Sequence, residues 1–332
     1  MANADKTKTG GNEATSTIKG TVTGSATSAS MPNRFRRRMT MLAAATAAIM
    51  AFGLAACGGA DTSGAGATSE KIEVVASINQ WGSVAEALGG DKVDVKSIMT
   101  STNVEAHDYE PTTSDVAAFT KAQIAVVNGA DYDPWASKAT EGTKADVVNA
   151  AETDGIKEGD NPHVWFSHDV REKTADAITA AYEKAMPDQK DYFEQRHKDW
   201  EAQEQKVEDK IKAAESKTKG VPYAASESVA WYLADDLGMT DATTSGYKNA
   251  SANESEPSPA DVKQFSDALK AGKMKVFVLN TQEANDTTDH LEAAASEGDA
   301  PVVKLTEQMP KEYTNLTDWM SALVDDFTGA VK

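Results

Sequence analysis

From residue 71 onward, the sequence alternates short β-branched runs with amphipathic stretches of helical length. This alternation is typical of α/β folds with largely parallel sheets, because parallel strands are joined by long crossovers that are usually helices. The predicted strands cover 71–77, 93–99, 123–128, 145–149, 221–225, 273–280 and 301–305. The predicted helices cover 81–88, 113–122, 168–185, 228–237, 259–271, 287–296 and 316–331.

A seven-residue pattern that begins Glu-Pro and ends Asp-Val occurs twice, at 110–116 and 256–262. In each copy the proline keeps the preceding residue extended. A Ser or Thr three residues before the Asp can then cap a helix. Each predicted helix leads into an apolar run that ends in asparagine, at Asn128 and at Asn280. We therefore predict two similar α/β lobes with largely parallel sheets.

Residues 187–216 contain no glycine and no proline after Pro187. Proline is favoured at the first position of a helix. The apolar residues form a narrow stripe on an otherwise charged stretch, which predicts a helix that packs along one side only. At 1.5 Å per residue, about 30 residues span roughly 45 Å. We predict an N-terminal lobe over 71–186, one long rigid helix over 187–216, and a C-terminal lobe over 217–332.

The first 56 residues have the composition of an extension followed by a secretory signal. Residues 1–30 contain a single isoleucine among Thr, Ser, Gly, Ala and Lys, and are too poor in apolar side chains to fold. Four arginines then precede an uncharged apolar run over 39–54, which is short for a membrane span. The signal can begin at Met1 or at Met31. We predict that 1–56 is an N-terminal extension and lipoprotein signal peptide.

The apolar run ends at Leu54-Ala55-Ala56-Cys57, which resembles the bacterial lipobox, and Cys57 is the single cysteine of the chain. The alternative is a buried core cysteine, a common environment for a free thiol. Residues 57–70, rich in Gly, Ala, Thr and Ser, are typical of a flexible tether. We predict lipidation at Cys57 and an extracytoplasmic protein anchored to the cell membrane.

The charge balance is strongly acidic, with 33 Lys and Arg against 52 Asp and Glu. Such a surface repels nucleic acid and attracts cations, although many exported proteins are simply acidic. The sequence contains no Gly-x-Ser-x-Gly, no phosphate-binding glycine loop and no His-Glu-x-x-His motif. We therefore predict that the protein is not an enzyme and has no nucleic-acid partner.

The chain has five histidines, which can be considered one by one. His197 lies among charged residues of the long helix and His290 on a polar helix, so both are predicted to be solvated. His168 stands at a helix start and is predicted to make local polar contacts. His107 follows the strand 93–99, and His163 lies in a polar loop that passes into apolar residues.

Two carboxylates of the second half occupy similar places: Glu227 follows the strand 221–225 and Glu307 follows the strand 301–305. In open α/β sheets, ligands bind outside the carboxyl ends of the strands. Two imidazoles and two carboxylates at such an edge suit a divalent first-row metal. The spacing along the chain does not by itself establish that the four residues meet.

Three segments resemble the solute-binding proteins of metal ABC transporters, the manganese/zinc-binding group whose lobes are joined by one rigid helix. The stretch 107–115 resembles the first metal-histidine motif of that family followed by Glu-Pro-Thr/Ser-x-x-Asp. Asn161-Pro162-His163-Val164-Trp165 resembles the Asp-Pro-His-Val-Trp motif, and 128–135 resembles the apolar segment between them. The resemblance covers 71–332.

The resemblance implies the metal ligands His107, His163, Glu227 and Glu307. The third ligand is His or Glu in this family, and Glu227 satisfies that pattern. The fourth is usually Asp in a Ser-Asp motif, whereas this chain has Thr-Glu307. That departure leaves Asn280 and Glu283 as alternatives.

The resemblance further implies an ABC importer receptor that captures Mn²⁺ or Zn²⁺ as transported solute and delivers it to a membrane permease, as a monomer. Residues 136–160 lack the histidine-rich loop of many zinc-selective members. A ligand set of two histidines and two carboxylates is relatively hard and suits Mn²⁺, whereas the general affinity order favours Zn²⁺. The alternatives are a metal-binding surface adhesin of the same fold and an exported metallohydrolase, which would need an open metal position and a separate base.

Overall fold

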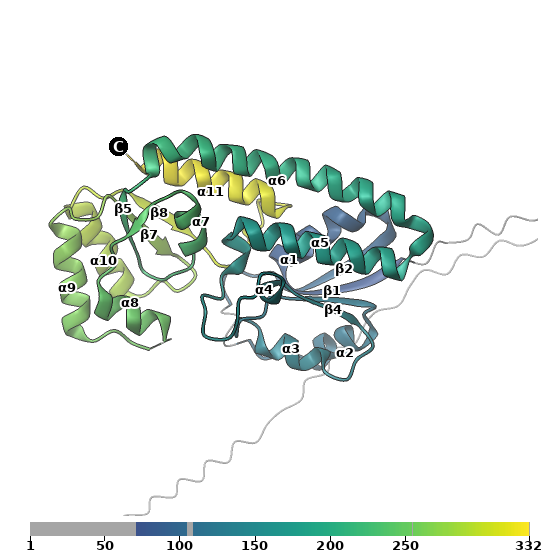
Figure 1. The fold of residues 1–332 in the computed structure, drawn as a ribbon. Helices are drawn as coiled ribbons and strands as arrows, with labels where there is room; N and C mark the ends of the chain where they lie inside the picture. The colour runs from purple at the N-terminus through teal and green to yellow at the C-terminus, as the bar shows by residue number, and fades with distance from the viewer. Residues whose placement is uncertain (1–70, 105–108, 254, 332) are drawn as a thin grey trace, which may run out of the picture. The chain divides into compact units, whose positions relative to one another are not determined.

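The computed structural model describes residues 71–104, 109–253 and 255–331, all within one compact unit. Cys57 and the predicted signal and tether lie outside these ranges. The first lobe contains a four-stranded, wholly parallel sheet in the order β2-β1-β3-β4 (Figure 1). Its strands are β1 (Ile72–Ile78), β2 (Val93–Met99), β3 (Ile124–Val127) and β4 (Asp146–Asn149).

The second lobe repeats this plan with a parallel sheet in the order β6-β5-β7-β8. Its strands are β5 (Pro222–Ala225), β6 (Thr240–Asp241), β7 (Val276–Asn280) and β8 (Val302–Leu305). The same order in both sheets confirms the prediction of two similar α/β lobes. The sequence did not predict β6, because two residues are too short to show a periodic pattern.

Helices cover both faces of each sheet (Figure 1). In the first lobe, α1 and α5 lie on one face, and α2 and α3 lie on the other. The helices of this lobe are α1 (Asn79–Gly89), α2 (Thr113–Lys121), α3 (Pro134–Thr140), α4 (Ala150–Thr153) and α5 (His168–Ala185). Those of the second lobe are α7 (Trp231–Asp236), α8 (Ser245–Ala252), α9 (Pro259–Lys270), α10 (Asp286–Glu297) and α11 (Leu316–Ala330).

The repeated Glu-Pro pattern begins equivalent helices in the two lobes. Thr112 accepts a hydrogen bond from the Asp115 backbone N–H, and the Asp115 carboxylate accepts one in return, which completes a capping box before α2. Ser258 caps α9 through the backbone N–H of Asp261 in the same way. These caps satisfy backbone donors that a helix leaves unpaired at its start.

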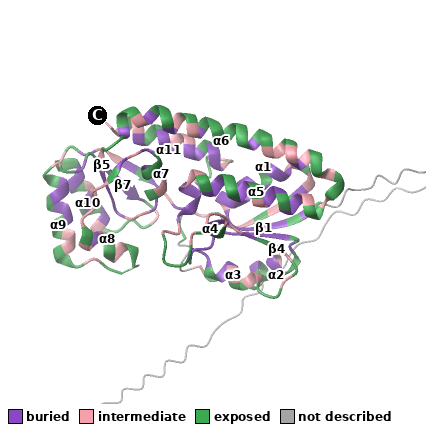
Figure 2. Ribbon diagram, in the orientation of Figure 1, coloured by how far each residue is buried: buried purple, intermediate pink, exposed green. Residues whose placement is uncertain are grey.

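The predicted linking helix is present as α6 (Lys190–Thr218), preceded by a 3-10 turn, η3 (Pro187–Gln189). Its buried apolar residues follow one stripe: Phe193, Trp200, Val207, Ile211 and Ala214. Along this stripe α6 packs against α1 and α5 of the first lobe and against α11. Figure 2 shows exposed residues along its outer side. The helix therefore contributes to the core of both lobes.

Most of the buried apolar side chains form one continuous cluster that runs from the first sheet through α5, α6 and α11 to the second sheet. A smaller cluster lies between the second sheet, α9 and α10. None of the helices in the described part of the chain has the length and apolar content needed to cross a membrane.

Candidate metal centre

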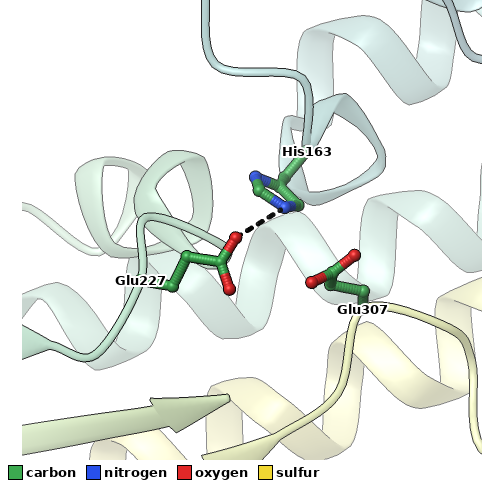
Figure 3. Close-up of side chains that lie close together, drawn as sticks. All are labelled: His163, Glu227 and Glu307. Atoms are coloured by element: carbon green, nitrogen blue, oxygen red, sulfur yellow. Dashed lines mark ion pairs between the residues drawn. The ribbon is translucent and has the colours of Figure 1, made fainter. Parts of the chain in front are cut away.

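Three of the four predicted ligands lie together. Each of His163, Glu227 and Glu307 offers a ligand atom, and these atoms all lie within 4.8 Å of one another. His163 Nε2 is 3.7 Å from Glu227 Oε1, and the Glu307 carboxylate lies beside this pair (Figure 3). The remaining predicted ligand, His107, belongs to 105–108, outside the described residues.

The three side chains come from both lobes. His163 belongs to the first lobe and immediately precedes a 3-10 turn, η2 (Val164–Phe166), whose side chains are fully buried. Glu227 and Glu307 follow β5 and β8 of the second lobe. His163 is 2% exposed and Glu307 is fully buried, whereas Glu227 is half-buried. An ion held here would therefore contact both lobes.

Asn161 orients the His163 ring. Its side-chain oxygen lies 2.8 Å from His163 Nδ1 and accepts the His163 backbone N–H at 3.0 Å. The Asn161 amide nitrogen donates to the Ser228 carbonyl in the other lobe, so its oxygen must be the atom that faces the ring. Because an amide oxygen can only accept, Nδ1 carries the proton and Nε2 has the lone pair that a metal needs.

Glu307 is held by side chains from both lobes. The Tyr132 hydroxyl donates to Glu307 Oε2 at 2.8 Å, and the Gln308 amide donates to the Tyr132 oxygen at 2.8 Å. Gln80, at the start of α1, donates to the Glu307 backbone carbonyl at 2.6 Å. The glutamate at this position is thus fixed in side chain and backbone.

Asn280, at the end of β7, lies between the two carboxylates. Its amide nitrogen is 2.8 Å from Glu227 Oε2 and 2.9 Å from Glu307 Oε1. Asn280, one of the two alternatives for the fourth ligand, therefore turns its amide nitrogen toward the carboxylates as a hydrogen-bond donor. Glu283 lines the neighbouring hollow and is not among the residues that cluster here.

An unusual backbone segment positions Tyr132. Gly129, Ala130 and Asp131 have φ angles of 79°, 50° and 62°, in the left-handed region that disfavours most side chains. Buried Asp133 holds this turn by accepting the backbone N–H groups of Asn128 and Gly129. Burial raises the pKa of Asp133 to about 6, although these hydrogen bonds oppose the shift. This strained turn thus places the Tyr132 hydroxyl within hydrogen-bond distance of Glu307.

A polar hollow of about 790 Å³ adjoins the cluster. His163 and Glu227 line it, together with Ser226, Ser228, Tyr247, Glu256, Glu283 and Asp286 among others. Its charged side chains near the cluster are acidic, so it offers cations a favourable approach to His163 and Glu227.

The other described histidines lie away from the cluster. His290 is exposed, as predicted. The prediction of a solvated His197 was wrong: this ring is half-buried, 2.9 Å from the Thr179 hydroxyl, because α5 packs against α6 there. His168 makes the predicted local polar contact with Glu172 of its own helix at 3.5 Å, and it also lies 3.0 Å from Glu204 of α6.

The sequence did not single out Tyr132 or Gln308 as parts of the site. Tyr132 lies in the 128–135 segment, which was interpreted only as an apolar wall. The one available signal was the position of Gln308 beside Glu307. Asn280 was identified as an alternative ligand, but its place between the carboxylates could not be foreseen.

Comparison with known proteins agrees with the family that the sequence motifs resemble. The family described as "Zinc-uptake complex component A periplasmic" matches residues 74–330. High-affinity zinc uptake system protein ZnuA of Bacillus subtilis (strain 168) is 26% identical over 281 residues, which cover 78% of this chain and 86% of that protein. Manganese ABC transporter substrate-binding lipoprotein PsaA of Streptococcus mitis is 23% identical over 229 residues, which cover 63% and 72%.

Solved structures share the fold. The laminin binding protein (Lmb) of Streptococcus agalactiae, described as a bifunctional protein with adhesin and metal transporting activity, superimposes with a TM-score of 0.66 at 22% identity. The match covers 79% of this chain and 100% of that chain.

Proposed function

Because this chain belongs to the family of periplasmic zinc-uptake component A proteins, metal-binding receptors of ABC transporters, we propose that it captures Zn²⁺ or Mn²⁺ with His163, Glu227 and Glu307. The ion is the transported solute and not a resident cofactor. Membership of a receptor family also argues against the metallohydrolase alternative.

One observation supports this site above all: an imidazole nitrogen and two carboxylates from both lobes converge within 4.8 Å. Ligands at 2.0–2.2 Å around a tetrahedral ion lie roughly 3.4 Å apart. The 3.7 Å between His163 Nε2 and Glu227 Oε1 is close to that value, so this pair needs little movement to share an ion. Two carboxylates and a neutral imidazole also match the charge of a divalent cation.

The remaining details of the proposal rest on the sequence and the relatives. His107 is proposed as the remaining ligand beside these three. The relatives are named for zinc and for manganese, so both metals remain candidates. We further propose lipidation of Cys57, an extracytoplasmic location, and delivery of the ion by a monomer to an ABC permease. Cys57→Ser should accumulate as an unprocessed precursor without lipid label, and normal labelling would contradict the anchor.

A second candidate function is adhesion. It is supported by the description of the Streptococcus agalactiae protein as both adhesin and metal transporter. Deletion of the gene should abolish metal-dependent growth if the chain is the receptor, and should reduce only attachment if it is an adhesin.

The direct test is calorimetric titration of metal into chelator-stripped protein. Glu227→Gln and Glu307→Gln keep the side-chain size and remove the charge, so each should weaken binding at least about tenfold. Glu283→Gln is the matched control, because Glu283 lines the adjoining hollow outside the cluster. Equal losses in Glu283→Gln and Glu307→Gln would contradict the proposed ligand set.

A further inference from the structure

The Asn280 side chain joins the two carboxylates of the cluster. One amide nitrogen donates to Glu227 Oε2 at 2.8 Å and to Glu307 Oε1 at 2.9 Å. Asn280 is 2% exposed, so this amide has no competing solvent contact of note. Both of its N–H groups are therefore used on the glutamates that are proposed to bind the metal.

One further contact fixes the direction of this amide, and another anchors the backbone of Asn280. The Asn280 side-chain oxygen accepts the backbone N–H of Gln282 at 3.0 Å. The Asn280 backbone N–H donates to the Ser226 hydroxyl at 3.0 Å, which anchors the residue to the loop that carries Glu227. Since a backbone N–H can only donate, the oxygen must face Gln282 and the nitrogen must face the carboxylates.

The consequence concerns how each glutamate can reach an ion. A carboxylate that chelates a metal must turn both of its oxygens toward it. Asn280 holds one oxygen of each glutamate, and Tyr132 holds the second oxygen of Glu307. These hydrogen bonds resist the rotation that two-oxygen chelation requires, and they set the distance between the two carboxylates.

We propose that Asn280 is a specificity-determining positioning residue that limits Glu227 and Glu307 to one metal–oxygen bond each and so favours Zn²⁺ over Mn²⁺. Zn²⁺ is satisfied by four ligands in a tetrahedron, whereas Mn²⁺ prefers a larger set of oxygen ligands. The inference rests on the proposed function, because it assumes that the two glutamates bind the ion.

The experiment measures Zn²⁺ and Mn²⁺ dissociation constants by competition on the full chain, and the absorption spectrum with Co²⁺ as a probe of coordination geometry. Asn280→Ala removes both donors. Asn280→Asp keeps the size and replaces the donating amide with a third carboxylate group. Asn315→Ala is the matched control: this asparagine caps α11 through the Asp318 backbone N–H, and so has a structural role only.

We expect the preference for Zn²⁺ over Mn²⁺ to fall about tenfold or more in Asn280→Ala, the usual effect of losing a residue that supports a metal ligand. In Asn280→Asp it should fall further, because the added oxygen favours Mn²⁺. The intense Co²⁺ absorption typical of four-coordination should weaken in both variants. Asn315→Ala should keep the parent preference and spectrum even though its thermal stability drops.

An unchanged preference and an unchanged Co²⁺ spectrum in both Asn280 variants, with the parent binding metal, would overturn this inference and leave the proposed function intact. A parent chain that binds neither metal would overturn both. Asn280→Asp preserves the side-chain volume, so it remains informative if Asn280→Ala does not fold.

Discussion

Glu204 and Glu307 are both fully buried, but their surroundings differ. Glu204, on α6, accepts hydrogen bonds from the Arg171 guanidinium, with Nε at 2.9 Å, and lies 3.0 Å from His168 Nδ1. Glu307 accepts hydrogen bonds from a tyrosine hydroxyl and an asparagine amide, and it shares its site with Glu227.

The difference indicates which buried carboxylate is structural and which is positioned for binding. A buried carboxylate is costly unless it is paired and hydrogen-bonded. Burial would raise the pKa of Glu204, but the charge of Arg171 and hydrogen bonds from His168 and Arg171 outweigh it and lower the pKa to about 2. Glu204 therefore has its cation within the fold. Glu307 instead lies with a second carboxylate and an imidazole, the set that is proposed to bind a divalent cation.

The largest expected effect is on the unfolding free energy, through the buried pair of Arg171 and Glu204. Arg171→Met would leave Glu204 buried without its guanidinium partner, which should cost about 3–5 kcal/mol in unfolding free energy. The double variant Arg171→Met/Glu204→Leu should recover most of this, since an apolar pair can replace a buried ion pair. Urea denaturation of metal-free protein measures both. A loss for Arg171→Met below about 1 kcal/mol, the range of an exposed ion pair, would contradict the structural role given to Glu204.

The second prediction concerns stabilisation by metal. Zn²⁺ at a thousandfold excess over its dissociation constant should raise the unfolding free energy of the parent by about 4 kcal/mol. Glu307→Gln should lose at least about 1.4 kcal/mol of this increase, the equivalent of tenfold weaker binding, because the charge that attracts the ion is removed. Glu204→Gln should retain the increase despite a lower starting stability. Thermal unfolding with and without metal distinguishes the two, and a full increase in Glu307→Gln would place the ion elsewhere.

The third prediction uses pH. The pKa of Glu204 is lowered from 4.5 to about 2 in the folded protein, so its contribution is present above pH 4.5 and is lost as the pH falls toward 2. The shift corresponds to about 3 kcal/mol. The parent should lose this much more stability than Arg171→Met/Glu204→Leu when denaturation is repeated at falling pH. Parallel curves would show that Glu204 does not titrate as described.

The smallest effect is expected from Tyr132→Phe, which removes the hydroxyl that donates to Glu307. Loss of one hydrogen bond to a charged group should weaken metal affinity by about 1.5 kcal/mol, or roughly tenfold. Tyr182→Phe is the matched control, because this buried hydroxyl donates to the Ala85 carbonyl in the first lobe. It should reduce stability and leave affinity unchanged. Equal affinity losses in both variants would point to a general packing effect.

Much of the fold was predictable because its signals are local. Strand 93–99 and helix 168–185 were predicted with the bounds that the structure gives, since periodicity and capping residues define them. Short elements such as α4 and β6 were missed, because a few residues carry too little pattern. Helix α7 begins at Trp231 and not at 228, which shows how weakly sequence defines a helix start without a clear cap.

The two equivalent asparagines show where local signals end. Asn128 and Asn280 both close an apolar strand, and the sequence treats them alike. In the structure the Asn128 amide donates to the backbone carbonyls of Gly129 and Pro162 and supports the loop before His163. Asn280 instead reaches two carboxylates. Nothing in the neighbouring residues distinguishes these two roles.

The sequence by itself determined the α/β class, the two similar lobes and the linking helix, because each follows from patterns within short stretches of chain. Only the tertiary structure decided that Glu227 and Glu307 face His163 and that Asn280 donates to both glutamates. Those hydrogen bonds join residues 53 and 27 positions apart. Their distances are set by parallel strand order and lobe packing, which no local pattern encodes.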